Sequence, residues 1–184
     1  MKALHWCCIG LVCVVLAGAG VSQNPSGAAT TGAQRSQERI THEVRHELIM
    51  LPQLSIFDNL QYKVDGNNVT LMGQVVNAVL KSSAESAVKG IEGVENVNNQ
   101  IEVLPPSPND DRIRMAVARA IFNDNRLFRY SMGSVPPIHI IVNRGHVTLE
   151  GVVNSQGDKD AASLRANGVS GVFSVENHLQ VQQS

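Results

Sequence analysis

The feature that most constrains this chain of 184 residues is an internal repeat with a period of about 78 residues. The segment 67–73 reads Asn-Asn-Val-Thr-Leu-Met-Gly, and the segment 145–151 reads Gly-His-Val-Thr-Leu-Glu-Gly. The alignment continues without a gap until Val103 meets Val181. Self-similarity at a fixed period indicates duplicated structural units. The sequence therefore predicts two copies of one small domain.

The repeated residues have local physical reasons. Valine, threonine and leucine alternate in each copy as a half-buried strand requires. Gly73 and Gly151 close this strand, where a bulge or a close approach of another backbone is expected. Gly93 and Gly171 open the last strand after a helix, where the turn requires a positive φ.

The periodicity predicts helix, strand, strand, helix and strand in each copy. The hairpin is antiparallel, and the long crossover through the second helix makes the last strand parallel to its predecessor. The predicted fold class is α+β, with two repeated α-β-β-α-β domains, each a three-stranded mixed sheet covered on one face by two helices. The predicted helices cover 36–50, 80–89, 110–123 and 158–166, and the predicted strands cover 62–64, 69–75, 94–103, 138–142, 147–153 and 172–181.

The N-terminus is predicted to be a secretory signal peptide. Lys2 precedes an apolar run, and Ala17, Gly18 and Ala19 form a small-x-small cleavage pattern. The alternative is an uncleaved N-terminal anchor. The resulting organisation is a signal peptide over 1–19, a flexible leader over 20–35, domains over 36–104 and 110–182, and a proline-rich linker over 105–109.

All three cysteines, Cys7, Cys8 and Cys13, lie inside the apolar run. No lipoprotein-type Leu-Ala-Gly-Cys stretch surrounds any of them, so no lipid anchor is expected. Cleavage would leave a mature chain without disulfides or a cysteine metal site. The formal charge of −1 provides no basic face for a nucleic acid. Domains of roughly 70 residues leave no room for a deep catalytic cleft, so we expect a protein that is not an enzyme and has no cofactor.

At this point the residues resemble a known family. Each copy has a Val-x-Leu-x-Gly strand, a helix and a Gly-Val-x-x-Val-x-Asn stretch, at 69–73 and 93–99 and again at 147–151 and 171–177. This arrangement is similar to tandem BON-domain proteins, a family named after bacterial OsmY and nodulation proteins. The resemblance implies the α-β-β-α-β fold, a periplasmic or envelope location, and non-catalytic attachment to phospholipid or other envelope components. Lipoprotein relatives carry an acylated cysteine, which this sequence is expected to lack.

One motif points to a metal instead. His42, Glu43 and His46 satisfy H-E-x-x-H on a predicted helix, where two imidazoles could bind zinc and the glutamate could act as a general base. The apolar stripe of this helix places both histidines toward water, and no third ligand is evident on a neighbouring element. We therefore expect no metal site. The second copy has Met115, Ala116 and Arg119 at these positions.

The second candidate site is a loop over 124–137, about five residues longer than its counterpart in the first copy. Aromatic side chains enter the boundary of the lipid headgroups, and arginines contact phosphates. The alternative is that Leu127 and Phe128 belong to the core and the arginines form a solvated rim. Asp158 and Asp160 are interpreted as charges at a helix start. The predicted lipid-binding residues are Arg126, Phe128, Arg129 and Tyr130.

Three functions follow from these observations. The first is an exported, non-catalytic binding protein of the envelope, periplasmic or secreted and peripheral to the membrane, attached to anionic phospholipid or another envelope component through the second domain. The second is a periplasmic adaptor or chaperone-like protein that binds envelope proteins. The third is a small zinc hydrolase that uses His42, Glu43 and His46.

Overall fold

The computed structural model describes residues 32–133 and 136–182, which belong to one compact unit, Thr31–Ser184. The predicted signal peptide and most of the predicted leader lie outside the described residues. The first helix begins at Gly32, four residues before the predicted start at Ser36. The other predicted helices and strands occur in the predicted order, except that the last strand of each copy is divided in two and a short 3-10 helix over Phe128–Ser131 was not predicted.

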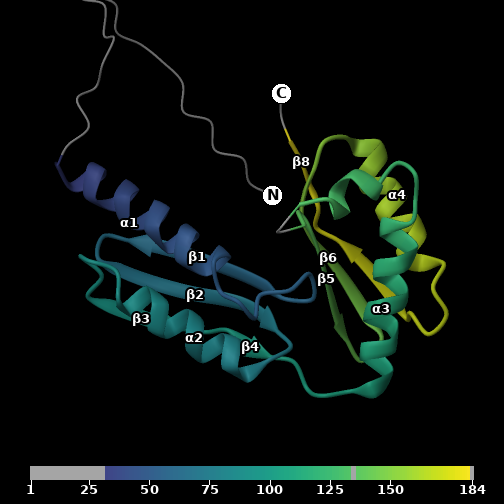
Figure 1. Cartoon of the computed structure of the whole chain (residues 1–184), viewed down its shortest axis with the longest axis horizontal. Coiled ribbons are helices and arrows are strands. Elements are labelled where there is room, and N and C mark those ends of the chain that lie inside the picture. The colour runs from purple at the N-terminus through teal and green to yellow at the C-terminus, as the bar shows by residue number, and fades with distance from the viewer. Residues whose placement is uncertain (1–31, 134–135, 183–184) are drawn as a thin grey trace, which may run out of the picture. The chain divides into compact units, whose positions relative to one another are not determined.

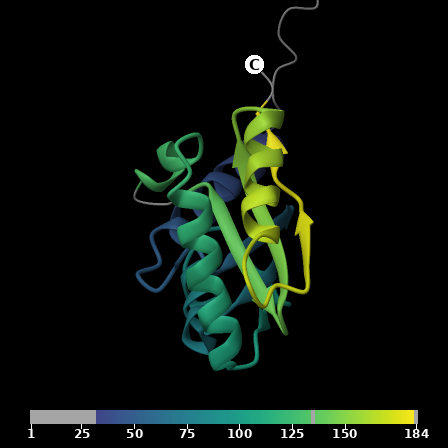
Figure 2. The same ribbon diagram turned by 90° about the vertical axis from the view of Figure 1, so that its right-hand side faces the viewer.

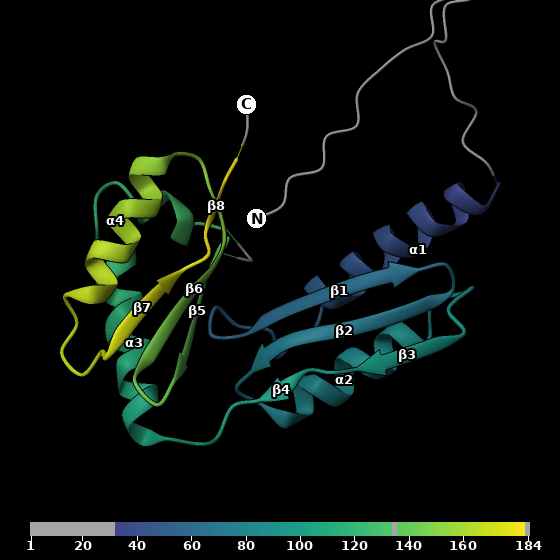
Figure 3. The ribbon, with the colours of Figure 1, turned by 180° about the vertical axis from the view of Figure 1, so that it is seen from behind.

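The first repeat contains a mixed sheet with the order β1-β2-β3. Strands β1 and β2 are antiparallel, whereas β3 and β4 both pair with β2 in parallel. Helices α1 and α2 cover one face of this sheet, and the view from behind shows the other face without a helix (Figure 1, Figure 3). The elements are α1 (Gly32–Ile49), β1 (Asn59–Asp65), β2 (Asn68–Val75), α2 (Ala78–Lys89), β3 (Asn96–Asn99) and β4 (Glu102–Val103).

The second repeat has the same topology, with β7 and β8 parallel to β6. Figure 2 shows its two helices, α3 and α4, side by side over one face of the sheet. Four helices and two mixed sheets in the described part of the chain confirm the predicted α+β fold. The elements are α3 (Pro108–Phe122), the 3-10 helix η1 (Phe128–Ser131), β5 (Ile138–Asn143), β6 (His146–Val153), α4 (Gln156–Asn167), β7 (Ser174–Asn177) and β8 (Gln180–Val181).

Each repeat has its own core of aliphatic side chains. The apolar stripe of the first helix consists of Ile40, Val44 and Leu48 and is buried against Leu71 and Leu80. The second core contains the corresponding stripe of α3 and the inward residues of β5 and β6. Burying one such side chain stabilises the folded state by roughly 1.5–3 kcal/mol. The stripes therefore fix the face of each helix that meets the sheet.

The predicted last strand is interrupted in both repeats. Asn99 donates its side-chain amide to the carbonyl of Lys81 at 3.1 Å and accepts from the backbone N–H of Ile101 at 3.1 Å. Asn177 donates to the carbonyl of Lys159 at 2.8 Å in the same way. The chain bends toward the helix at each of these asparagines. As a result, the predicted last strand is divided into β3 and β4 in the first repeat and into β7 and β8 in the second.

The two glycines that close the repeated strands have the predicted close approach. Gly73 has φ 107° and Gly151 has φ 119°, a region that favours glycine. A Cβ atom at Gly73 would overlap the carbonyl group of Asn59, and one at Gly151 would overlap that of Pro137. Only glycine lets the two strands of each hairpin approach this closely.

Asp110, in the first turn of α3, has a structural role outside its own helix. Ser107 caps α3 by accepting from the backbone N–H of Asp110. The Asp110 carboxylate is buried and accepts from the backbone N–H groups of Arg144 and Gly145, both at 2.9 Å. Asp110 therefore holds the turn between β5 and β6.

Candidate functional site

A single buried carboxylate fastens the long loop of the second repeat to α4. Asp158 is 1% exposed and accepts from the guanidinium of Arg129 at 2.7 Å and the hydroxyl of Tyr130 at 2.9 Å. The same hydroxyl accepts from the backbone N–H of Asn154 at 2.8 Å. We call residues 124–133 the anchored loop. Because Leu80 occupies the position of Asp158 in the first repeat, that repeat cannot form this network.

The surroundings of Asp158 keep its carboxyl group ionised. Burial alone would raise the pKa, but hydrogen bonding with Ser155 and Tyr130 and the charge of Arg129 lower it further than burial raises it. The net result is a pKa below the ordinary aspartate value. At neutral pH, Arg129 therefore faces a charged partner.

Asp124 organises the beginning of the anchored loop. Its carboxylate accepts from the backbone N–H of Arg126 at 2.8 Å and from the guanidinium of Arg165 at 2.7 Å. These two contacts, the backbone bond first, lower the pKa of Asp124. Arg126 donates its side chain to the carbonyl of Gly157 at 3.3 Å. A groove of about 590 Å³ lies between the loop and α4 and is lined by Arg126 and Arg165 among others.

Burial separates the four predicted lipid-binding residues. Tyr130 is 6% exposed and belongs to the core, whereas Phe128 is 54% exposed. Arg126 is exposed, and within the described chain it has no carboxylate within 4.0 Å. Arg129 is half exposed but paired with Asp158. The structure thus leaves Arg126 and Phe128 available at the surface, with Leu127 buried beneath them.

Sequence reasoning missed two kinds of residue at this site. Asp158 was interpreted as a helix-start charge, although aligning the repeats places it opposite the apolar Leu80. That mismatch is the signal that could have revealed a buried polar network. Met132 in the loop and Leu164 on α4 are 75% and 73% exposed, and their exposure has no signal in the spacing of the sequence.

The H-E-x-x-H residues lie on α1. Both histidine side chains are exposed, and Glu43 accepts from the guanidinium of Arg39 at 3.0 Å. His46 lies 3.6 Å from the carboxylate of its neighbour Glu47. Across residues 32–133 and 136–182, no group of three or more His, Cys, Asp or Glu side chains is placed to hold a metal ion. The arrangement around Glu43 is that of a surface ion pair.

In the part of the chain that the structure describes, no helix combines the length and the apolar composition that crossing a membrane requires.

Comparison with known proteins gives one family. The family model described as "BON domain" matches residues 36–105 and again residues 109–183. The outer membrane lipoprotein DolP of Haemophilus influenzae is 28% identical over 172 residues, which cover 90% of this chain and 86% of that protein.

Among solved structures, the C-terminal domain of CdsD, a structural protein of the type III secretion system of Chlamydia trachomatis, is 12% identical with a TM-score of 0.32. It covers 77% of this chain and 96% of that chain. A second CdsD structure has a TM-score of 0.33 at 12% identity, covering 79% and 93%. These scores are too low to support an argument about this chain.

Proposed function

The chain belongs to the BON domain family, and from this premise we propose that it is an exported, non-catalytic binding protein of the bacterial envelope that attaches to anionic phospholipid through its second repeat. An envelope location is supported by the predicted signal peptide and by the similarity to a protein named as an outer membrane lipoprotein.

The observation that carries the proposal is the exposure of apolar side chains on the anchored loop. Phe128 and Met132 are 54% and 75% exposed, although they flank the buried Tyr130. Apolar side chains of this kind bury themselves at the boundary between headgroups and acyl chains. Because Asp158 already holds the loop against α4, little conformational freedom would be lost on binding.

The charge of this surface is modest. Arg129 and Arg165 each face an aspartate at 2.7 Å, which leaves Arg126 as the loop arginine with a guanidinium available to a phosphate. One cation near an anionic bilayer contributes about 1 kcal/mol. We therefore propose that insertion of Phe128 and Met132 acts together with Arg126 and that neither contribution alone is sufficient.

Flotation of the chain with phosphatidylglycerol and phosphatidylcholine vesicles tests the proposal. We expect binding to phosphatidylglycerol that weakens as salt rises, because the phosphate contact is screened. Arg126→Glu and Phe128→Ser should each reduce the vesicle-bound fraction about tenfold. Lys63→Glu, a charge reversal at an exposed position of β1, is the matched control. No flotation at low salt, or equal losses in the Lys63 control, would contradict the proposal.

A second candidate function is an adaptor that binds other envelope proteins. A separate observation favours it, namely an open strand edge in the first repeat.

A further inference from the structure

Strand β1 is an edge strand with unpaired backbone groups. Among the described strands, β1 pairs with β2 alone, in the sheet order β1-β2-β3. The carbonyl of Val64 accepts from the side-chain amide of Gln37 at 3.2 Å, so it faces away from β2. In an antiparallel pair, every second residue of a strand directs its backbone N–H and C=O groups toward the partner strand, and the residues between direct theirs away from it. Tyr62 and Leu60 therefore present these groups to the same outer edge as Val64. None of the described residues forms a hydrogen bond with these groups of Tyr62 and Leu60.

In the second repeat, the equivalent edge, that of β5, is hydrogen-bonded to another segment of the chain. Ile140 is the equivalent of Tyr62, and its backbone N–H donates to the carbonyl of Ile56 at 2.7 Å. Val142 is the equivalent of Val64, and its carbonyl accepts from the guanidinium of Arg114 at 2.7 Å. In the second repeat, therefore, a carbonyl group from another segment of the chain occupies the edge that the first repeat leaves open.

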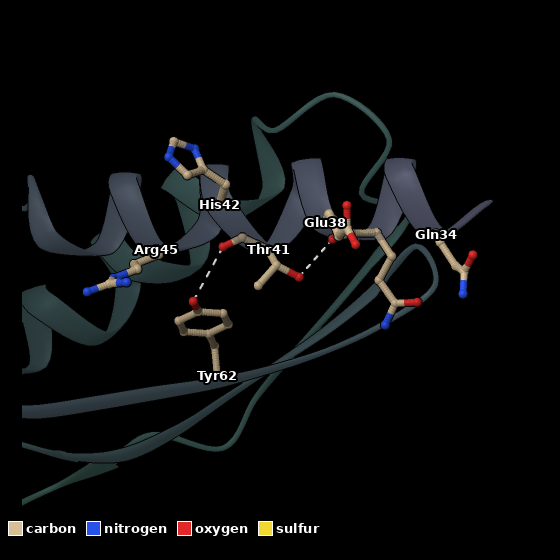
Figure 4. Close-up of a pocket in the computed structure, with 7 residues that line it drawn as sticks. Gln34, Glu38, Thr41, His42, Arg45 and Tyr62 are labelled. Carbon is tan, nitrogen blue, oxygen red and sulfur yellow. Dashed lines mark hydrogen bonds between the residues drawn. The ribbon is translucent and has the colours of Figure 1, made fainter. Parts of the chain in front are cut away.

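A groove runs beside the open edge because the helix above it has a short side chain. Arg114 is 3% exposed and fills the space between α3 and β5, whereas its equivalent on α1 is Thr41. A groove of about 490 Å³ lies here in the first repeat and is lined by Thr41, Arg45 and Tyr62 among others. Figure 4 shows Tyr62 rising from β1 toward the carbonyl of Thr41, 3.4 Å away.

A second groove, of about 340 Å³, shares Arg45 and Tyr62 with the first and extends to Leu60. The two grooves thus follow the edge-facing residues of β1. Arg45 is exposed, and within residues 32–133 and 136–182 it has no carboxylate within 4.0 Å. The carboxylate of Glu38 also lines the first groove, but Arg45 is the charged residue that both grooves share. At that shared point, Arg45 favours a ligand that carries a carboxylate.

We infer that the outer edge of β1 binds an extended segment of another polypeptide as an added strand, with an acidic residue of that segment facing Arg45. Main-chain hydrogen bonds to Leu60, to Tyr62 and to the N–H of Val64 supply affinity, as in other cases of strand addition, and the groove beneath α1 receives alternate side chains. Natural edge strands avoid such pairing through coverage, proline or charged side chains such as lysine. Strand β1 contains no proline, and the side chain of its one lysine, Lys63, points to the face of the sheet opposite Tyr62. Apart from His139 of β5, which lines the second groove, the site lies in the first repeat, and it does not depend on the proposed lipid surface.

Amide hydrogen exchange of the full chain tests the inference. The probe is an eight-residue peptide of alternating valine and threonine with one central glutamate, and the control probe is the same peptide N-methylated at alternate amides. The free protein should protect the amide of Ile140 and leave that of Tyr62 unprotected. A saturating amount of the probe should raise the protection of the Tyr62 amide at least about tenfold, and the methylated peptide should not.

Thr41→Arg introduces into the groove of the first repeat the residue type that Arg114 provides at the equivalent position of the second. This variant should weaken binding of the probe about tenfold without lowering the midpoint of thermal unfolding, whereas Thr41→Ser should bind normally. Equal binding of the methylated peptide would overturn the inference, because main-chain pairing would then be unnecessary. Protection of Tyr62 in the free protein would also overturn it. If that protection rises with protein concentration, a second copy of this chain occupies the edge.

Discussion

At the scale of single residues, the two repeats differ at a buried position that holds Leu80 in one and Asp158 in the other. Both side chains are buried at the same place on the second helix of their repeat. An apolar residue there contributes to a core, whereas a carboxylate must find hydrogen-bond donors. Asp158 finds them in Arg129 and Tyr130, and so it determines where the anchored loop lies.

Asp158→Asn should lower the free energy of unfolding by about 1–3 kcal/mol at pH 7, because the buried Tyr130 hydroxyl and the Arg129 guanidinium lose a charged acceptor. The pKa of Asp158 is lower in the folded chain than the ordinary value of 3.8. Its contribution is therefore fully present above the ordinary value and is lost as pH falls through the lowered one. The difference between the wild type and Asp158→Asn should shrink as the pH falls below about 4.

Urea denaturation of both proteins between pH 7 and pH 2.5 measures this difference. Asp160→Asn is the control, because Asp160 is exposed and, among the described residues, accepts from the side chain of Gln156 alone. We expect its stability to stay within about 0.5 kcal/mol of the wild type. A difference for Asp158→Asn that does not change with pH would show that the charge of Asp158 has no part in holding the loop.

The loop illustrates what the sequence could not predict at this scale. Two arginines and two aromatic residues within five positions indicated a binding surface. Which of them face solvent depends on Asp158, which lies 28 residues after Tyr130, and spacing along the chain carries no information about that pairing. The structure consequently separates the four predicted lipid-binding residues into exposed and buried side chains, a difference that the sequence did not predict.

At the scale of elements, hydrophobic periodicity predicted the type and order of the helices and strands in each repeat, apart from η1 and the division of the last strand. Stripes such as Ile113, Val117 and Ile121 identify the buried face of a helix without reference to tertiary structure. The last strand was predicted as continuous because its valines alternate. The strand is interrupted because the side chains of Asn99 and Asn177 donate to carbonyl groups of the preceding helix. Strand propensity, which depends on neighbouring residues in the sequence, does not predict these contacts.

Asn177→Ala tests the role of this interruption. The variant loses the bond to the carbonyl of Lys159 at 2.8 Å and leaves the backbone N–H of Leu179, now 3.2 Å from the asparagine oxygen, without an acceptor. We expect a loss of about 1–3 kcal/mol in the free energy of unfolding. Denaturant titration followed by circular dichroism measures the loss. Asn98→Ala, an exposed position next to the equivalent Asn99, should change stability by less than about 0.5 kcal/mol.

Equal effects of the two substitutions would mean that asparagine at this position is not structural. If Asn177→Ala destabilises the protein more than Asn98→Ala does, the Gly-Val-x-x-Val-x-Asn stretch of each repeat has a physical explanation. Its glycine allows the turn after the helix, with φ 93° at Gly171, and its asparagine returns the chain to that helix.

At the scale of the whole molecule, duplication allows one fold to present two different surfaces. In the first repeat, Thr41 leaves a groove beside an open edge. There the buried Asp58, which lies in the loop itself, holds the loop by accepting from the backbone N–H groups of Ser55 and Val76. In the second, Arg114 fills the equivalent groove and Asp158 organises the anchored loop. The difference between Thr41 and Arg114 thus leaves the groove open in the first repeat and filled in the second. The difference between Leu80 and Asp158 gives the second repeat its anchored loop.

This division of roles predicts that the two binding activities are independent. Arg126→Glu and Thr41→Arg lie in different repeats and share no hydrogen-bonding partner. Effects at sites without shared partners are usually additive within about 0.3–0.5 kcal/mol. Arg126→Glu should therefore reduce flotation with phosphatidylglycerol vesicles and leave the protection of the Tyr62 amide by the peptide probe unchanged. Thr41→Arg should show the reverse.

The double variant, measured in both assays, completes the cycle. If the activities are independent, its vesicle binding equals that of Arg126→Glu and its peptide binding equals that of Thr41→Arg. A coupling larger than about 0.5 kcal/mol in either assay would contradict independence. It would mean that the membrane and the peptide compete for one surface, or that one ligand changes the affinity for the other. Without such coupling, a protein bound to a bilayer through its second repeat would keep the edge of β1 free for an extended polypeptide.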